Sequence, residues 1–230
     1  MEEEISYLEN ISLKIENVID GGANKGDWSN ALLQKFSDIK HLHLIEPNPL
    51  HLDYLSERFA NKSVVSFSQK GLSYRNDILK LNYRLGYDSH ASLNFGKTST
   101  DEICETVDCI TLDDLISQLN WQRVDLLKLD LEGFDYFALL GLTKTLSANK
   151  VKIIQFEVTR SWDKNGCCPM NALKLLQNNN FDCYHIHNNR LIKFNDLNVP
   201  NFSIYSNFVA MHKSIQDLIK LSSFHSILLT

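Results

Sequence analysis

Residues 18–26 read VIDGGANKG, and this stretch decides the fold of the chain. An apolar run leads into a glycine-rich turn, and residues 27–37 then carry apolar side chains at helical spacing. Glycines let the backbone approach a ligand closely, and the start of a helix offers free N–H groups. Further on, Glu46 ends a second apolar run, where a carboxylate can accept hydrogen bonds from both hydroxyls of a ribose. Together the two features predict a site for a nucleoside cofactor.

Length and composition narrow the class of protein. The chain has 230 residues, which fits one α/β domain and leaves little room for a second. Apolar residues make up 43% and charged residues 22%, as in ordinary soluble globular domains. Because the net charge is −5, broad attraction to nucleic acid or to an anionic membrane is not expected.

The first residues and the cysteines predict a cytoplasmic protein. The start, MEEE, lacks the basic and apolar parts of a signal peptide, and no apolar run approaches the ~20 residues that span a bilayer. The five cysteines include no C-x-x-C pair, so we expect neither a zinc site nor a disulfide framework. Reduced thiols in a cytoplasm are the simplest interpretation.

Strand and helix patterns alternate along most of the chain. We expect strands over residues 17–21, 41–46, 63–69, 124–130, 151–157, 181–187 and 203–211. We expect helices over 27–37, 49–60, 112–119, 133–147 and 169–179, the third capped by Thr111 or Asp113. This alternation predicts an α/β fold with right-handed βαβ units and a largely parallel sheet.

Three segments fall outside this alternation, within an expected single domain over 1–230. Residues 71–110 are polar and show short alternation at 78–83 and 105–110, which predicts a hairpin-like insertion or lid over the carboxyl edge of the sheet. Residues 1–16 form an N-terminal extension. Residues 213–230 read as an amphipathic helix and a short tail, which we expect to pack on the domain or on a second copy of the chain.

The glycine turn distinguishes between two cofactors. A dinucleotide site requires G-x-G-x-x-G/A, and here Ala23 stands where the backbone must approach the pyrophosphate. Counted from Asp20, the pattern is D-x-G-x-x-x-G, which resembles motif I of the class I S-adenosylmethionine-dependent methyltransferases. That turn wraps the amino acid end of a cofactor that has no phosphate.

A third motif makes the resemblance specific. Residues 126–135 read LLKLDLEGFD, in which a strand ends in two carboxylates and a glycine before a helix. In this motif and others the chain resembles the FkbM-type methyltransferases. The matching segments are DGGANKG at 20–26, EPNP at 46–49, LDDL at 112–115, KLDLEG at 128–133 and IIQFE at 153–157. They follow the family's order, and Gly21 replaces its usual aliphatic residue. Beyond Glu157 the chain carries little family signal.

The resemblance implies a Rossmann-like class I methyltransferase fold, with a mostly parallel seven-stranded sheet and helices on both faces. It also implies S-adenosylmethionine as cofactor and O-methylation of a carbohydrate hydroxyl in a glycan, a lipopolysaccharide or a sugar-bearing natural product. The expected cofactor-binding residues are Asp20, Gly21, Gly22, Asn24, Gly26, Glu46, Asn48, Gly71, Leu72, Ser73, Ser92, Asp130 and Glu132. The alternative for Asn48 is to cap the helix that begins at Pro49.

The expected reaction calls for a base near the methyl group of the cofactor, because the acceptor hydroxyl loses its proton as it attacks that methyl group. The candidates are Asp130, Glu157 and His90. The alternative for Asp130 is to cap the N-terminus of the helix that follows it. The alternative for His90 is an exposed position in a loop, without a role in the reaction. Arg160 and Trp162 are expected to contact the acceptor, although packing is the plainer interpretation for Trp162.

Other interpretations stay open at this point. Asp130, Glu132 and Glu157 offer oxygen ligands of the kind that Mg²⁺ or Ca²⁺ prefer, but we favour a site without metal. An NAD-dependent dehydrogenase or epimerase would explain the turn and Glu46, but it does not suit Ala23. A degenerate domain that binds a cofactor or a partner without turnover is the non-enzymatic alternative. A homo-oligomer also stays open.

Overall fold

The computed structural model describes residues 2–84, 87–94, 103–187, 190–194 and 206–219. At residues 2, 3, 84, 87–92, 94, 187 and 190 the description is limited to the backbone.

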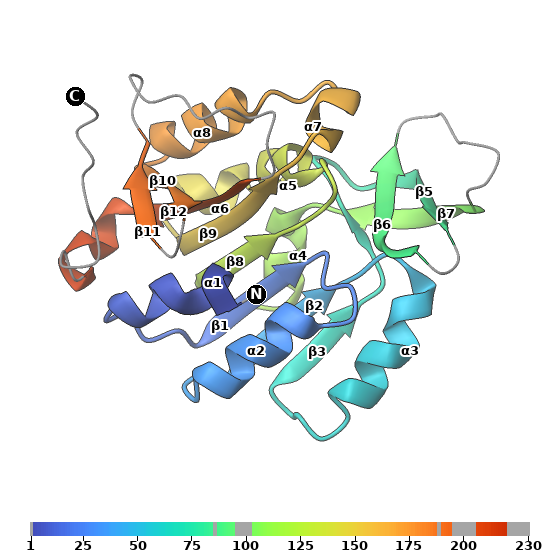
Figure 1. Ribbon diagram of the computed structural model, residues 1–230, viewed down its shortest axis with the longest axis horizontal. Helices are drawn as coiled ribbons and strands as arrows, with labels where there is room; N and C mark the ends of the chain where they lie inside the picture. Colours follow the sequence, from blue (N-terminus) through green and yellow to red (C-terminus); the bar gives the residue numbers. More distant parts are fainter. Residues whose placement is uncertain (1, 85–86, 95–102, 188–189, 195–205, 220–230) are drawn as a thin grey trace.

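An eight-stranded sheet runs through the molecule in the order β11-β10-β12-β9-β8-β1-β2-β3 (Figure 1). Its strands are β1 (Asn17–Gly21), β2 (His41–Ile45), β3 (Val65–Ser68), β8 (Val124–Leu129), β9 (Val151–Val158), β10 (Phe181–His187), β11 (Arg190–Lys193) and β12 (Ser206–His212). The five strands from β9 to β3 are parallel, whereas β12, β10 and β11 join antiparallel. The expected α/β fold is confirmed, with eight strands instead of seven because the sequence pattern missed the short β11.

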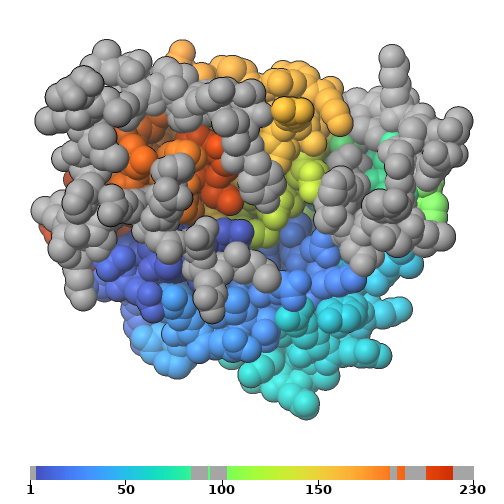
Figure 2. Space-filling view, viewed as in Figure 1, coloured from blue at the N-terminus to red at the C-terminus, as the bar shows by residue number. Residues whose placement is uncertain are grey.

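Apolar cores lie on both faces of this sheet, which explains the nearly continuous apolar runs of its strands. Successive side chains alternate between the faces, so Val18 joins one core and Ile19 the other. The core around Val18 is closed by α1 (Glu2–Ser6), the 3₁₀ turn η1 (Tyr7–Asn10), α2 (Asp27–Lys35) and α3 (Pro49–Arg58). The core around Ile19 is closed by α4 (Leu112–Gln118), α5 (Asp135–Leu140), α6 (Thr143–Ser147), α7 (Ser161–Lys164) and α8 (Pro169–Asn178). In the space-filling view, the N-terminal elements in blue and cyan form the lower part of the visible face (Figure 2).

The strand order reverses between β1 and β8. From β1 the chain continues to β2 and β3 on one side, and from β8 it continues to β9 on the other. In open α/β sheets ligands bind at such a switch point, outside the carboxyl ends of the strands.

The insertion folds as a second sheet, ordered β4-β7-β5-β6. Its strands are β4 (Gly71–Leu72), β5 (Asp77–Arg84), β6 (Tyr87–Asn94) and β7 (Ile103–Ile110), and it lies beyond the N-terminal end of α3 (Figure 1). The expected antiparallel pairing is confirmed, since Ile78 pairs with Asp108 and Tyr83 with Ile103. Phe134, from the loop between β8 and α5, packs into the core of this sheet. That contact joins the insertion to the third motif.

The prediction of a single helix over 133–147 is wrong, because the helix is interrupted at Gly141 and the segment forms two helices, α5 and α6. A Cβ at Gly141 would lie 2.3 Å from the carbonyl oxygen of Ser73, so the break lies against the start of the insertion. Asp113 then accepts hydrogen bonds from the backbone N–H groups of Lys144 and Thr145 at the start of α6. Thr111, rather than Asp113, caps α4.

Near the C-terminus, where we expect an amphipathic helix and a short tail over 213–230, the described residues form the 3₁₀ turn η2 (Lys213–Leu218). Residues 220–230 lie outside the described residues. Among the helices of the described ranges, none has both the length and the apolar character needed to cross a membrane.

Candidate functional site

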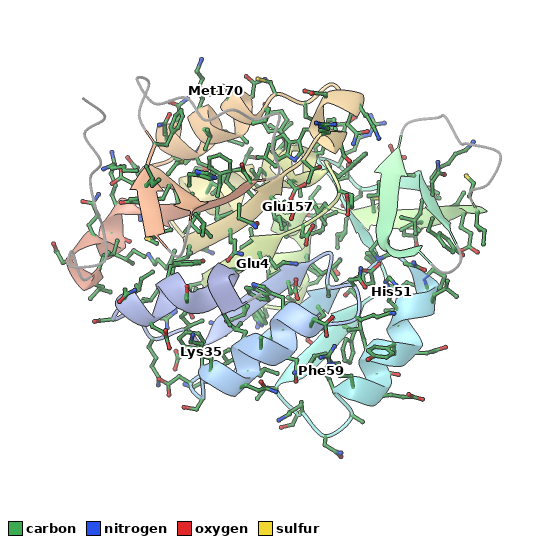
Figure 3. All side chains as sticks on the ribbon, viewed as in Figure 1. Glu4, Lys35, His51, Phe59, Glu157 and Met170 are labelled. Carbon is green, nitrogen blue, oxygen red and sulfur yellow. The ribbon has the colours of Figure 1, made fainter. Side chains whose placement is uncertain are left out.

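A cavity of about 190 Å³ opens at the carboxyl edge of the main sheet, at the switch point. It is bounded by the segments that follow β1, β2, β3 and β8, by the end of β9 and by the second sheet. Its lining residues are Gly22, Asn24, Ile45, Glu46, Pro47, His51, Lys70, Gly71, Leu72, Leu81, Leu93, Asp130, Leu131, Glu132 and Glu157. Figure 3 shows His51 on α3 and Glu157 at the end of β9. Seven of the residues expected at the site from the sequence meet here: Gly22, Asn24, Glu46, Gly71, Leu72, Asp130 and Glu132, joined by the base candidate Glu157.

The glycine turn lies directly against the loop that follows β8. Gly22 has a φ of 75°, and a Cβ there would lie 1.9 Å from the carbonyl oxygen of Asp130. Only glycine fits this position without moving one of the two segments. The N–H groups of Gly22 and Ala23 both donate to the carbonyl oxygen of Ile45, so the turn is held against the end of β2.

The Glu46 carboxylate ties two turns together. Its Oε2 accepts from the backbone N–H of Asn24 at 2.8 Å, and its Oε1 accepts from that of Asn48, also at 2.8 Å. The residue is 5% exposed and lines the cavity. Each carboxylate oxygen has a second lone pair, so Glu46 can still accept hydrogen bonds from a ligand.

A buried ion network lies beneath the cavity. Lys128 Nζ lies 3.2 Å from Oδ1 of Asp20 and 3.4 Å from Oδ2 of Asp130. Ser29 donates to Oδ2 of Asp20 at 2.6 Å. Burial alone would lower the pKa of Lys128, but the charges of Asp20 and Asp130 outweigh it and raise the pKa above its usual value. Asp130 therefore lines the cavity with the Lys128 ammonium group beside it.

The loop from Asp130 to Asp135 shapes the acidic side of the cavity. Glu132 and Gly133 both have positive φ, 51° and 94°. Because α5 begins only at Asp135, with Phe134 at its N-cap position, the N-cap alternative for Asp130 is wrong. Across the described ranges, no three His, Cys, Asp or Glu side chains are grouped so that they could hold a metal ion.

Asp135 is a buried carboxyl group just behind this loop. Burial, together with the negative charge of Asp130, raises its pKa to about 8, while nearby backbone N–H groups oppose the rise. No described residue makes a hydrogen bond with either carboxylate oxygen. At neutral pH the side chain therefore holds a proton.

Several expected contacts are corrected by the structure. Asn48 caps α3, accepting from the N–H of Leu50, and Asp20 lies under the turn in the ion network. Trp162 is 1% exposed, and its indole N–H donates to the carbonyl oxygen of Glu157, so its ring packs in the core and cannot stack on an acceptor. Ser73 is buried, and its N–H donates to the carbonyl oxygen of Ile110.

The remaining predicted residues fall outside the lining. Gly21 and Gly26 shape the turn, and a Cβ at Gly26 would lie 2.5 Å from the Phe59 ring. Arg160 is exposed at the start of α7. The side chains of His90 and Ser92, in β6, lie outside the described residues.

Sequence reasoning did not single out His51, Leu81 and Leu93 in the cavity wall. His51 could have been found, because it precedes Leu55 and Phe59 at intervals of four residues on the buried face of α3. Leu81 and Leu93 lie opposite each other in β5 and β6. Their position depends on how the insertion packs, which no local pattern reveals.

Comparisons with known proteins agree with this geometry. Residues 20–195 match the family described as methyltransferase FkbM domain. A methyltransferase FkbM from Methylobacillus flagellatus KT has a similar structure, with a TM-score of 0.54 and 16% identity, over 85% of this chain and 44% of that one. A precorrin-6y C5,15-methyltransferase from Geobacter metallireducens GS-15 is similar over 91% of this chain and 87% of its own, with a TM-score of 0.50 and 10% identity. At such identities the likeness concerns the fold alone.

This chain spans less than half the length of the M. flagellatus protein. No curated protein matches the sequence. The family match overturns the alternative of an NAD-dependent dehydrogenase or epimerase.

Proposed function

This chain belongs to the FkbM methyltransferase family, and from that premise we propose that it transfers the methyl group of S-adenosylmethionine to a hydroxyl of a carbohydrate. The observation that carries the proposal is one cavity in which Glu46, the glycine turn and Asp130 meet at the switch point. The acceptor would be part of a glycan, a lipopolysaccharide or a sugar-bearing natural product.

The residues of the cavity fit the parts of this cofactor. Glu46 keeps free lone pairs for the ribose hydroxyls, and the apolar side chains of Ile45, Leu72, Leu81 and Leu93 suit an adenine ring. Backbone at Gly22 and Asn24 suits the amino acid end, which carries no phosphate. The cofactor supplies a methyl group that is already activated by a positively charged sulfur. The protein's main task is then to hold the acceptor hydroxyl in line with that methyl group.

Glu157 is the better candidate for the base that takes the proton from the acceptor hydroxyl. The Asp130 carboxylate already lies 3.4 Å from the Lys128 ammonium, inside the ion network that also holds Asp20. Glu157 lines the same cavity from the end of β9, and its backbone is fixed by the indole N–H of Trp162. We assign proton acceptance to Glu157 and cofactor binding to Asp130. His90 stays a prediction.

The acidic side of the cavity also suits a carbohydrate. The carboxylates of Asp130, Glu132 and Glu157 accept hydrogen bonds only, and a sugar offers several hydroxyl donors. These carboxylates also suit the positive charge of the cofactor. The net charge of −5 argues against nucleic acid as acceptor.

Titration calorimetry tests the cofactor. S-adenosylhomocysteine should bind the purified protein, and NAD should not. Glu46→Ala should weaken binding by about 10- to 100-fold, the range for lost hydrogen bonds to a charged group. Glu57→Ala removes the same charge from the exposed face of α3 and should leave affinity unchanged.

A transfer assay then tests the reaction. Methyl-labelled S-adenosylmethionine is incubated with a panel of neutral glycosides, and labelled products are separated by chromatography. Transfer to a sugar hydroxyl, lost in Glu157→Gln while S-adenosylhomocysteine still binds, supports the proposal. Binding of NAD alone would overturn it. Cofactor binding with no transfer to any carbohydrate would favour a module without turnover.

A further inference from the structure

We propose that His51 and Glu46 together recognise one hydroxyl of the cofactor ribose, so that His51 is a second ribose-binding residue of this cavity. The proposal rests on the proposed function, because it assumes a nucleoside cofactor in this cavity. His51 lines the cavity beside Glu46, near the N-terminal end of α3 (Figure 3).

Local structure fixes where the imidazole ring of His51 lies. Pro49 begins α3 and Asn48 caps it, so the first turn of the helix is held against the end of β2. His51 then occupies the buried stripe of the helix, one turn before Leu55. Its side chain is only 4% exposed. An apolar residue would be expected at this position, and the sequence instead places a polar ring at the cavity wall.

The ring lacks a hydrogen bond that a buried polar atom normally has. Within the described ranges, Nδ1 of His51 has no hydrogen-bond partner. It lies 3.7 Å from Oε1 of Glu46, which is too long for a direct hydrogen bond. His43, also buried, shows the contrast, because its two ring nitrogens lie 2.8 Å and 2.9 Å from the hydroxyls of Ser66 and Ser68. A buried polar atom aimed into a cavity without a partner points to a ligand.

The distance between the two atoms suits a hydroxyl group. Two atoms 3.7 Å apart can both lie about 2.8 Å from one oxygen placed between them. Oε1 of Glu46 already accepts one backbone N–H and keeps one lone pair, so it can accept the hydroxyl hydrogen. With its proton on Nδ1, the imidazole donates to the oxygen of the same hydroxyl. A hydroxyl is both donor and acceptor, and it therefore satisfies both partners.

The test compares S-adenosylhomocysteine with its 2′-deoxy and 3′-deoxy analogues by titration calorimetry. The variants are the unaltered protein, His51→Leu and His51→Asn. His51→Leu places an apolar side chain on the buried stripe of α3. His51→Asn keeps a polar side chain there and is used if the leucine variant does not fold. The matched control is His41→Leu, which makes the same substitution at an exposed residue at the opposite, amino end of β2.

We expect His51→Leu to weaken binding of S-adenosylhomocysteine about fivefold, the effect of losing one ordinary hydrogen bond. The same variant should leave affinity for one of the two deoxy analogues unchanged, because that analogue lacks the hydroxyl that His51 contacts. The affinity of His51→Leu for the other analogue should fall about as much as its affinity for S-adenosylhomocysteine does. The identity of the unaffected analogue tells which hydroxyl is recognised.

Two results would overturn this inference alone. Equal weakening for all three compounds would mean that His51 acts on the shape of the site, and unchanged affinity for the parent compound would mean that it makes no contact. Failure of the unaltered protein to bind S-adenosylhomocysteine would overturn the proposed function and this inference with it.

Discussion

Lys128 on β8 forms a buried ion pair with Asp20 on β1, with 3.2 Å between Nζ and Oδ1. The two residues are direct neighbours in the register of the parallel strands. Asp20 begins the segment DGGANKG and Lys128 begins the segment KLDLEG, so the pair links two segments that are far apart in sequence. Lys128 also reaches Asp130, which places one cation between the turn and the acidic wall of the cavity.

Lys128→Met should be strongly destabilising. The substitution leaves Asp20, which is fully buried, without its cation, and breaking a buried pair from one side typically costs about 3–5 kcal/mol. The free energy of unfolding from urea denaturation measures the effect. Lys150→Met changes an exposed lysine at the end of the loop before β9 and should shift stability by less than about 0.5 kcal/mol. A similarly small effect for Lys128→Met would show that Asp20 finds another partner.

Because Asp135 is buried, the stability of the folded protein should depend on pH, and the sign of that dependence can be predicted. Its ordinary pKa is 3.8, and burial raises it to about 8 in the folded protein. Between these values the folded state holds a proton that the unfolded chain has released. The contribution of Asp135 to stability therefore falls as pH rises from about 4 to about 8, by up to ~1.4 kcal/mol per pH unit.

Asp135→Asn replaces the acid with a neutral group of the same shape and should remove this contribution. The difference in unfolding free energy between variant and parent should then grow in favour of the variant from pH 5 to pH 8. Denaturation at a series of pH values measures it. Asp163→Asn, at an exposed residue of α7, should show a constant difference. A constant difference for Asp135→Asn as well would show that the carboxyl is ionised in the folded protein.

The sequence motifs predicted the main sheet and the part of the site built from it. Gly22, Glu46 and Asp130 end strands whose apolar runs are local and unambiguous, and the carboxyl ends of parallel strands meet at one edge. The residue types could not show which side-chain atoms already make hydrogen bonds within the protein. Asn48 suits either a cap or a ligand contact, and only the fold shows that its oxygen caps α3.

The missed features depend on contacts between distant segments. The helix is interrupted at Gly141, where the backbone lies close to the carbonyl oxygen of Ser73. Helix propensity depends on local sequence and therefore cannot predict a contact with a distant segment. Trp162 suited either an acceptor contact or packing from its sequence position, and the deciding feature is a backbone acceptor for its indole N–H in the core. Leu93 reaches the cavity only because β6 pairs with β5.

Gly22→Ala should abolish binding of S-adenosylhomocysteine. Gly22 and Gly166 both have positive φ, 75° and 68°, but a Cβ at Gly22 would lie 1.9 Å from the carbonyl oxygen of Asp130, whereas a Cβ at Gly166 meets nothing within 4 Å. Gly166→Ala therefore isolates the backbone strain, which costs about 1–2 kcal/mol of stability. Gly22→Ala adds the clash, which pushes the turn away from Asp130 and distorts the cavity. Denaturation and calorimetry on both variants separate the two effects. Equal stability losses, with cofactor affinity kept in both, would contradict the close approach of the turn to the loop after β8.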